Sequence, residues 1–122
     1  MIFYSVKNHI LELTVSPPYL MADADLMLEA IGRDPGVPDG APLLVDARAF
    51  AVVLSQTEIE ARLQDLRVRL GPKLGPACAV VIETHEQHLG ARIFQMNAAT
   101  VDLRVGVFDD LGEARAWLAA RR

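Results

Sequence analysis

The sequence has very little cysteine, since Cys78 is the one thiol among 122 residues. A single cysteine excludes an intrachain disulfide and favours a reducing compartment. Cys78 lies in the apolar run ACAVVIE, where we expect it to pack as a small buried group with a raised thiol pKa. The N-terminal residues lack the charged region, apolar stretch and cleavage site of a secretory signal, so a cytoplasmic location is expected.

Long apolar runs and basic clusters are missing as well. No apolar stretch approaches the ~20 residues of a membrane span, so membrane insertion is not expected. The net charge is −4 and the longest basic cluster is Arg121-Arg122, which argues against a nucleic-acid partner. Hydrophobic residues, by contrast, make up 52% of the chain, enough to build a full core in one domain over residues 1–122.

Segments typical of strands alternate along the chain with segments typical of helices. Short β-prone runs near the N-terminus indicate a hairpin, and the later apolar runs LLVDA and ACAVVIE are typical of strands buried on both faces. Strands are expected at 2–6, 11–15, 43–47, 77–83 and 101–107, the last near a sheet edge, with a hairpin turn at Lys7-Asn8. Helices are expected behind a cap at Asp23 or Asp25, over 56–70, over 86–98, and from Asp109 or Asp110 onwards.

The order of these segments, β-β-α-β-α-β-α-β-α, predicts an α/β fold. Strands that alternate with helices form parallel sheets through right-handed crossovers. We therefore expect a mixed, mainly parallel sheet of four to five strands, about four helices and an antiparallel N-terminal β-hairpin. In the helix over 86–98, the spacing predicts that Leu89, Ile93 and Met96 face the core.

Ser55 precedes the helix expected over 56–70. The run Ser55-Gln56-Thr57-Glu58 has the S-x-x-E spacing of a capping box, in which the serine oxygen accepts from the Glu58 amide and the Glu58 side chain accepts from the Ser55 amide. A phosphate at a helix N-terminus is favoured by the helix dipole, so Ser55 and Thr57 are also candidate regulatory phosphosites. Both roles are open at this point, and they are compatible with each other.

Three segments carry a resemblance to a known family. They are LLVDAR before a helix that opens with Ser, GARIFQMNA at 90–98, and LRVGVFDDLGEARAWLAA at 103–120. Together with size and element order, they resemble the STAS domain, the SpoIIAA-like fold of anti-sigma-factor antagonists, and most closely its STAS/SEC14-type branch. The resemblance covers nearly the whole chain. It implies a non-enzymatic SpoIIAA-like module that acts in regulation by protein-protein interaction.

The resemblance also locates a switch position. In the sporulation type, Asp-Ser-Ser-Gly opens the helix after the central strand, and a partner kinase phosphorylates one of its serines. This chain has Leu54-Ser55-Gln56-Thr57 there, without the preceding acid and without the glycine. Ser55 therefore lies at the position of the family switch within a different local sequence.

Polar residues that follow the expected parallel strands form a candidate pocket rim. In open α/β sheets, ligands bind beyond the carboxyl ends of the strands. Asp46 and Arg48 follow the central strand, Glu83 and His85 follow the next one, and Asp109 follows the last. The alternative is that Asp46 and Arg48 pair with each other on the surface, since no glycine-rich phosphate loop accompanies them.

Motifs for catalysis are missing, so we do not expect an enzyme or a cofactor. The chain has no G-x-S-x-G, Walker, G-x-G-x-x-G or C-x-x-C pattern. His85 and His88 are weak metal-ligand candidates, with Glu83 and Asp46 as further donors for a metal-dependent site. Their H-E-Q-H spacing differs from the H-E-x-x-H of zinc proteases, which requires the two histidines four residues apart.

Five apolar residues, FAVVL, occupy the connection between the central strand and the helix over 56–70. Such a segment either folds inward or presents a contact patch, so Phe50, Val52, Val53 and Leu54 are candidate partner-binding residues. This segment and the antiparallel sheet edge are also candidate surfaces for a homodimer. A small apolar ligand or lipid carrier is the alternative function, because the chain is rich in apolar residues and small alanines that would leave room for a cavity.

Overall fold

The computed structural model describes residues 1–51 and 54–121, and its strands form one five-stranded sheet in the order β1-β2-β3-β4-β5. β1 runs antiparallel to β2, and the other neighbours are parallel. The strands are β1 Ile2–Lys7, β2 Ile10–Val15, β3 Ala41–Asp46, β4 Leu74–Val81 and β5 Arg104–Phe108. The helices are α1 Met21–Arg33, α2 Gln56–Leu70, α3 His85–Asn97 and α4 Leu111–Ala119, with 3-10 turns at Gly71–Lys73 and Ala98–Val101. The predicted α/β class and element order are thereby confirmed.

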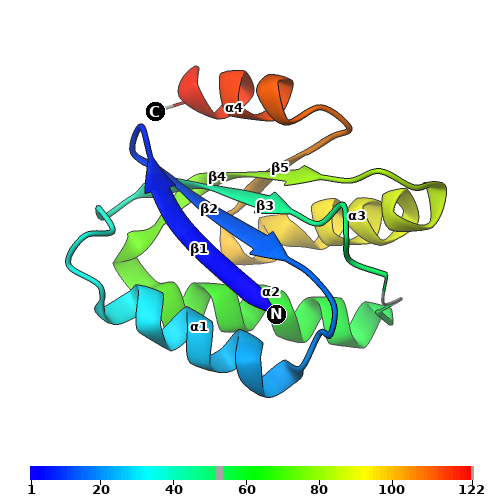
Figure 1. Ribbon diagram of the computed structural model, residues 1–122, viewed down its shortest axis with the longest axis horizontal. Coiled ribbons are helices and arrows are strands. Elements are labelled where there is room, and N and C mark those ends of the chain that lie inside the picture. The colour runs from blue at the N-terminus through cyan, green and yellow to red at the C-terminus, as the bar shows by residue number, and fades with distance from the viewer. Residues whose placement is uncertain (52–53, 122) are drawn as a thin grey trace.

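Helices cover both faces of the sheet, but unequally (Figure 1). α1, α2 and α3 lie on one face, as expected when consecutive right-handed crossovers follow the strand order, and α4 alone lies on the other. The larger core lies under the three helices and includes Leu43, Leu63 and Cys78. Burial raises the pKa of the Cys78 thiol to about 12, in line with the expected buried role. The smaller core lies under α4 and includes Leu44 and Leu118.

The N-terminal hairpin turns one residue later than predicted. Asn8 and His9 have φ of 53° and 67°, so both central turn residues adopt the left-handed conformation of a type I′ hairpin. Asparagine enters this region more easily than most residues, because its short amide bonds locally. The hairpin leaves β1 as one edge of the sheet, and β5 is the other edge, as predicted.

Three local expectations were wrong. α1 begins at Met21 with Leu20 as its cap residue, so neither Asp23 nor Asp25 caps it. The last strand begins at Arg104, because a 3-10 turn occupies the residues before it. In α3, Leu89 is 56% exposed and Met96 is 79% exposed. The side of this helix that faces the core carries the buried Ala91 and the half-buried Ile93 and Phe94, and Ala98 of the following 3-10 turn continues it.

Candidate functional site

The candidate site lies at the carboxyl ends of β3 and β4. The Ala47 amide donates to the Val81 carbonyl at 2.9 Å, and the Ile82 amide donates to the Phe108 carbonyl at 2.9 Å. These bonds extend the sheet ladder one residue beyond each strand. The connection from β3 to α2 therefore begins beside the connection from β4 to α3, and the predicted rim residues come from these two connections and from the end of β5.

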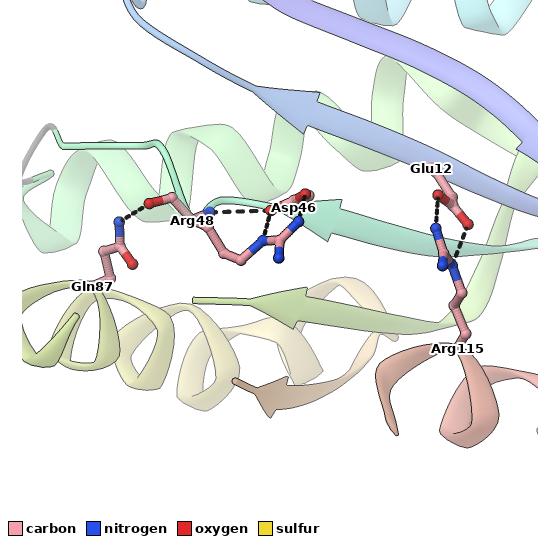
Figure 2. A network of polar contacts seen from close by, with 5 residues as sticks. All are labelled: Glu12, Asp46, Arg48, Gln87 and Arg115. Atoms are coloured by element: carbon pink, nitrogen blue, oxygen red, sulfur yellow. Dashed lines mark hydrogen bonds and ion pairs between the residues drawn. The ribbon is translucent and has the colours of Figure 1, made fainter. Parts of the chain in front are cut away.

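Asp46 and Arg48 form an ion pair at this end of the sheet (Figure 2). The Arg48 Nε and Nη2 atoms donate to the two Asp46 carboxylate oxygens at 2.9 and 2.8 Å, and the Arg48 amide donates to Asp46 at 3.2 Å. The bonds from Arg48 keep the pKa of the Asp46 carboxyl below its usual value, and those same contacts raise the pKa of Arg48. The geometry is that of the surface pair named above as the alternative to a ligand-binding acid.

Gln87 connects the two loops. Its Nε2 donates to the carbonyl oxygens of Arg48 at 2.8 Å and Phe50 at 2.9 Å, and its Oε1 accepts from the amides of Glu83 at 2.6 Å and Thr84 at 3.0 Å. Every hydrogen-bonding group of the amide is thus used. Figure 2 shows the Gln87 side chain pointing from α3 toward the backbone at Arg48.

Sequence reasoning missed Gln87, although a signal was present. Thr84-His85-Glu86-Gln87 has the T-x-x-Q spacing of a capping box, and the structure contains that box at the start of α3. The spacing identifies a cap and gives no information about the Arg48 and Phe50 carbonyls, which belong to another connection. The long-range half of the contact therefore comes only from the fold.

Ser55 caps α2 as predicted. Its Oγ accepts from the Glu58 amide at 3.2 Å, and its own amide donates to Glu58 Oε1 at 3.1 Å, so both halves of the capping box are present. The bonds from Ser55 keep the pKa of the Glu58 carboxyl below its usual value. Thr57 lies exposed in the first turn of α2. Phosphorylation of Ser55 or Thr57 stays a prediction.

The apolar connection is described at its two ends. The Phe50 ring lies edge-on against Tyr19, with ring centroids 4.9 Å apart, and its amide donates to the Ala47 carbonyl at 3.0 Å. Leu54 packs half-buried against the larger core. Val52 and Val53 lie outside the described residues. Phe50 and Leu54 are thus packed from one side and partly open to solvent on the other.

The remaining rim residues lie at the surface. Glu83, His85 and Asp109 are exposed. Two hollows in the described part of the chain lie elsewhere, and both are open to solvent: one of about 290 Å³ between β1 and α1, and one of about 450 Å³ between α1 and α2. Ligand pockets usually enclose most of the ligand surface, so an apolar ligand in either hollow would remain largely in water.

The two histidines do not converge on a common point with further ligands. His88 accepts a bond from Arg92 Nε at its Nε2 atom, 3.2 Å away, while His85 is exposed. Within the described residues, no group of three or more histidine, cysteine, aspartate or glutamate side chains is placed to bind a metal ion.

A second ion pair stabilises the sparsely covered face of the sheet. Glu12 of β2 is only 8% exposed, and Arg115 of α4 donates to both of its carboxylate oxygens at 2.9 and 3.0 Å (Figure 2). The bonds to Glu12 raise the pKa of Arg115. The two residues are 103 positions apart in the chain, so no local sequence pattern predicts the contact.

Over the described residues, these features define the class of protein: an α/β protein with a mixed five-stranded sheet, with α1, α2 and α3 on one face and α4 on the other. Comparison of the chain with protein-family models, with curated proteins and with solved structures finds no match. Among the helices in the described residues, none has both the length and the apolar character needed to cross a membrane.

Proposed function

We propose that this chain is a non-enzymatic SpoIIAA-like module that acts in regulation by binding a partner protein through the connection between β3 and α2. The observation that carries the proposal is the Gln87 amide, which donates to the carbonyls of Arg48 and Phe50 and so fixes the start of the apolar connection. Binding through residues that the chain already holds in place, as it holds Arg48 and Phe50, costs less conformational entropy than binding through residues that are free.

The side chains of Asp46, Arg48 and Gln87 beside this connection already bond within the chain. Both Asp46 carboxylate oxygens accept from Arg48, and all hydrogen-bonding groups of the Gln87 amide have partners. A catalytic acid or base must reach substrate with the same atoms that are engaged here. This pattern favours a surface that supports a contact over one that performs chemistry.

Phe50 is the residue that we expect to contribute most to binding. Aromatic side chains are enriched among the residues that dominate interface energy, because they bury a large area with few rotatable bonds. Phe50 rests on Tyr19 and is fixed through its own carbonyl, so its ring is oriented before a partner arrives. The cap at Ser55 fixes the other end of the connection.

A capture experiment tests the proposal. Tagged protein is compared with a Phe50→Ala variant and with Leu89→Ala, a matched loss of an apolar side chain at an exposed position on α3. We expect one partner to be recovered in amounts comparable to the bait, at least about tenfold less of it with Phe50→Ala, and no change with Leu89→Ala. Recovery of the bait alone, or equal recovery with both variants, would overturn the proposal.

A further inference from the structure

The two edges of the sheet differ in how they are closed. At the β5 edge, the Gln95 side chain of α3 donates to the Val105 carbonyl at 2.8 Å, so part of the strand's outer edge is already bonded. β1 has the sequence IFYSVK, with no proline and no charge before its last residue. Natural edge strands are usually protected by prolines, charges or coverage, and an edge without them is a template for another strand.

The outward backbone groups of β1 follow from its pairing with β2. The Ser16 amide donates to the Met1 carbonyl at 2.8 Å and the Met1 amine donates to the Ser16 carbonyl at 2.5 Å, so these two residues exchange both bonds. Exchanging pairs alternate along an antiparallel ladder. Therefore Ile2, Tyr4 and Val6 point their amides and carbonyls away from β2.

α1 lies alongside β1, and one side of this helix exposes apolar and charged side chains to solvent. Asp23, Leu26, Met27, Ala30 and Arg33 are spaced by three, one, three and three residues, which places them on one side of the helix. Leu26 is 66% exposed. The first four of these residues line the apolar hollow of about 290 Å³, together with Met1, Ile2 and Phe3 of the β1 segment. Arg33 lies next to Leu26 around the helix, at the border with the hollow between α1 and α2 that it also lines.

The charges on this face are arranged for a copy of the same helix in the opposite direction. Asp23 lies in the first turn of α1 and Arg33 in the last. Within residues 1–51 and 54–121, neither side chain has an ion-pair partner. The other acids of the helix, Asp25 and Glu29, face α2 and pair with Arg62 and Arg69.

We infer that a second copy of this chain covers this surface, forming a two-fold dimer in which β1 pairs antiparallel with β1 of its mate and α1 packs antiparallel against α1. A two-fold axis at Tyr4 matches Ile2 with Val6 of the mate and satisfies all three outward residues. Antiparallel packing of the two α1 helices about their midpoints pairs each Asp23 with the mate's Arg33 and places each exposed Leu26 opposite the small Ala30. This surface is separate from the β3–α2 connection, so the dimer stands or falls independently of the proposed function.

Charge reversal tests the pairing directly. Asp23→Arg alone places two arginines at each contact, and Arg33→Asp alone places two aspartates there. In a mixture of the two variants, every contact is again between opposite charges. We expect the wild-type chain to sediment as a dimer, each single variant to dimerise at least about tenfold more weakly, and the one-to-one mixture to form a heterodimer that native mass spectrometry separates from either homodimer.

Further variants control for folding and test the strand. Glu86→Arg reverses an exposed charge on α3 and should leave the dimer intact, and circular dichroism confirms that each variant folds. Val6→Pro removes one outward amide from the edge strand and should weaken the dimer, whereas Val6→Thr retains the amide and should not. A wild-type chain that stays monomeric up to about 100 µM, or a mixture that does not restore dimers, overturns the inference. If the chain is monomeric, the outer edge of β1 would instead be open to pairing with a strand of a different protein.

Discussion

The carboxyl end of the sheet and the outer side of β1 and α1 are both exposed, but they differ in how their polar groups are used. At the carboxyl end, Gln87, Arg48 and two capping boxes bond to the Asp46 carboxylate and to backbone groups of the two connections. Along β1 and α1, strand amides and two opposite charges point outward. A surface whose groups are already satisfied binds through the side chains that it presents, whereas a surface with outward backbone groups is completed by another strand.

Both surfaces rest on the same hydrophobic core, so we expect substitutions in that core to lower the stability of the fold most. Leu63 of α2 is 1% exposed in the larger core, and Leu63→Ala should cost about 3 kcal/mol of unfolding free energy through lost burial and the cavity left behind. Val68→Ala on the same helix removes a side chain that is 76% exposed and should change stability by less than about 0.5 kcal/mol. Urea unfolding measures both, and similar values for the two variants would contradict the assignment of the core.

Gln87→Ala tests whether the carboxyl end is ordered by one side chain. The variant loses the side-chain half of the α3 capping box and the bonds to the neighbouring connection, whereas the bond from the residue 87 amide to Thr84 Oγ1 stays. We therefore expect the free energy of unfolding to fall by about 2 kcal/mol. Hydrogen exchange at the Phe50 amide should accelerate as well. Gln87→Glu keeps the acceptor for the cap but places an oxygen that cannot donate beside the Arg48 and Phe50 carbonyls, so exchange at the Phe50 amide should accelerate at least as much as in Gln87→Ala. Unchanged exchange in both variants would show that Gln87 does not order the connection.

Ser55→Ala should cost about 1 kcal/mol, the usual value of an N-cap. Asparagine is as good a cap as serine, so Ser55→Asn should restore most of the stability. Thermal unfolding of the three proteins separates a cap from a residue that matters only through modification. If Asn is as damaging as Ala, the hydroxyl has a role beyond capping.

Of these substitutions, Tyr4→Phe should change the free energy of unfolding least. It tests the hydrogen bond that joins β1 to Asp34. The Tyr4 hydroxyl donates to Asp34 Oδ2 at 2.7 Å, and this bond keeps the pKa of the Asp34 carboxyl below its usual value. Because the folded pKa is lowered, the bond stabilises the protein above the unfolded pKa of about 3.9 and the benefit is lost as pH falls through the folded value. We expect the Asp34 pKa to rise in the variant, as measured by NMR titration. The difference in unfolding free energy between the two proteins should be present at neutral pH and should disappear at acid pH. A difference that does not depend on pH would show that the bond to Asp34 is not its cause.

Much of the fold could be predicted because its signals are local. α2 begins and ends at the predicted residues, since the capping box at Ser55 sets its start and a glycine-proline sequence follows Leu70. The buried strands β3 and β4 were visible as continuous apolar runs. The order of strands and helices then fixed the parallel sheet, because crossovers are right-handed.

The contacts that could not be predicted from the sequence are those that join distant parts of the chain. Glu12 meets Arg115 across 103 residues, and Gln87 reaches carbonyls that lie 37 and 39 residues earlier. In α3, apolar residues lie on more than one side of the helix, so only packing decides that Ala91 is buried and Met96 is exposed. The spacing of apolar residues shows which sides of a helix could be buried, and the packing of the whole fold determines which of these sides is buried.

Contact between a partner protein and the connection from β3 to α2 can be detected by crosslinking. The most direct measurement places a photoreactive amino acid at Phe50, and in a matched protein at Val68, which is 76% exposed on α2. After irradiation in living cells, we expect one discrete crosslinked protein from position 50 and none from position 68. No adduct at position 50, or the same adduct at both positions, would contradict it.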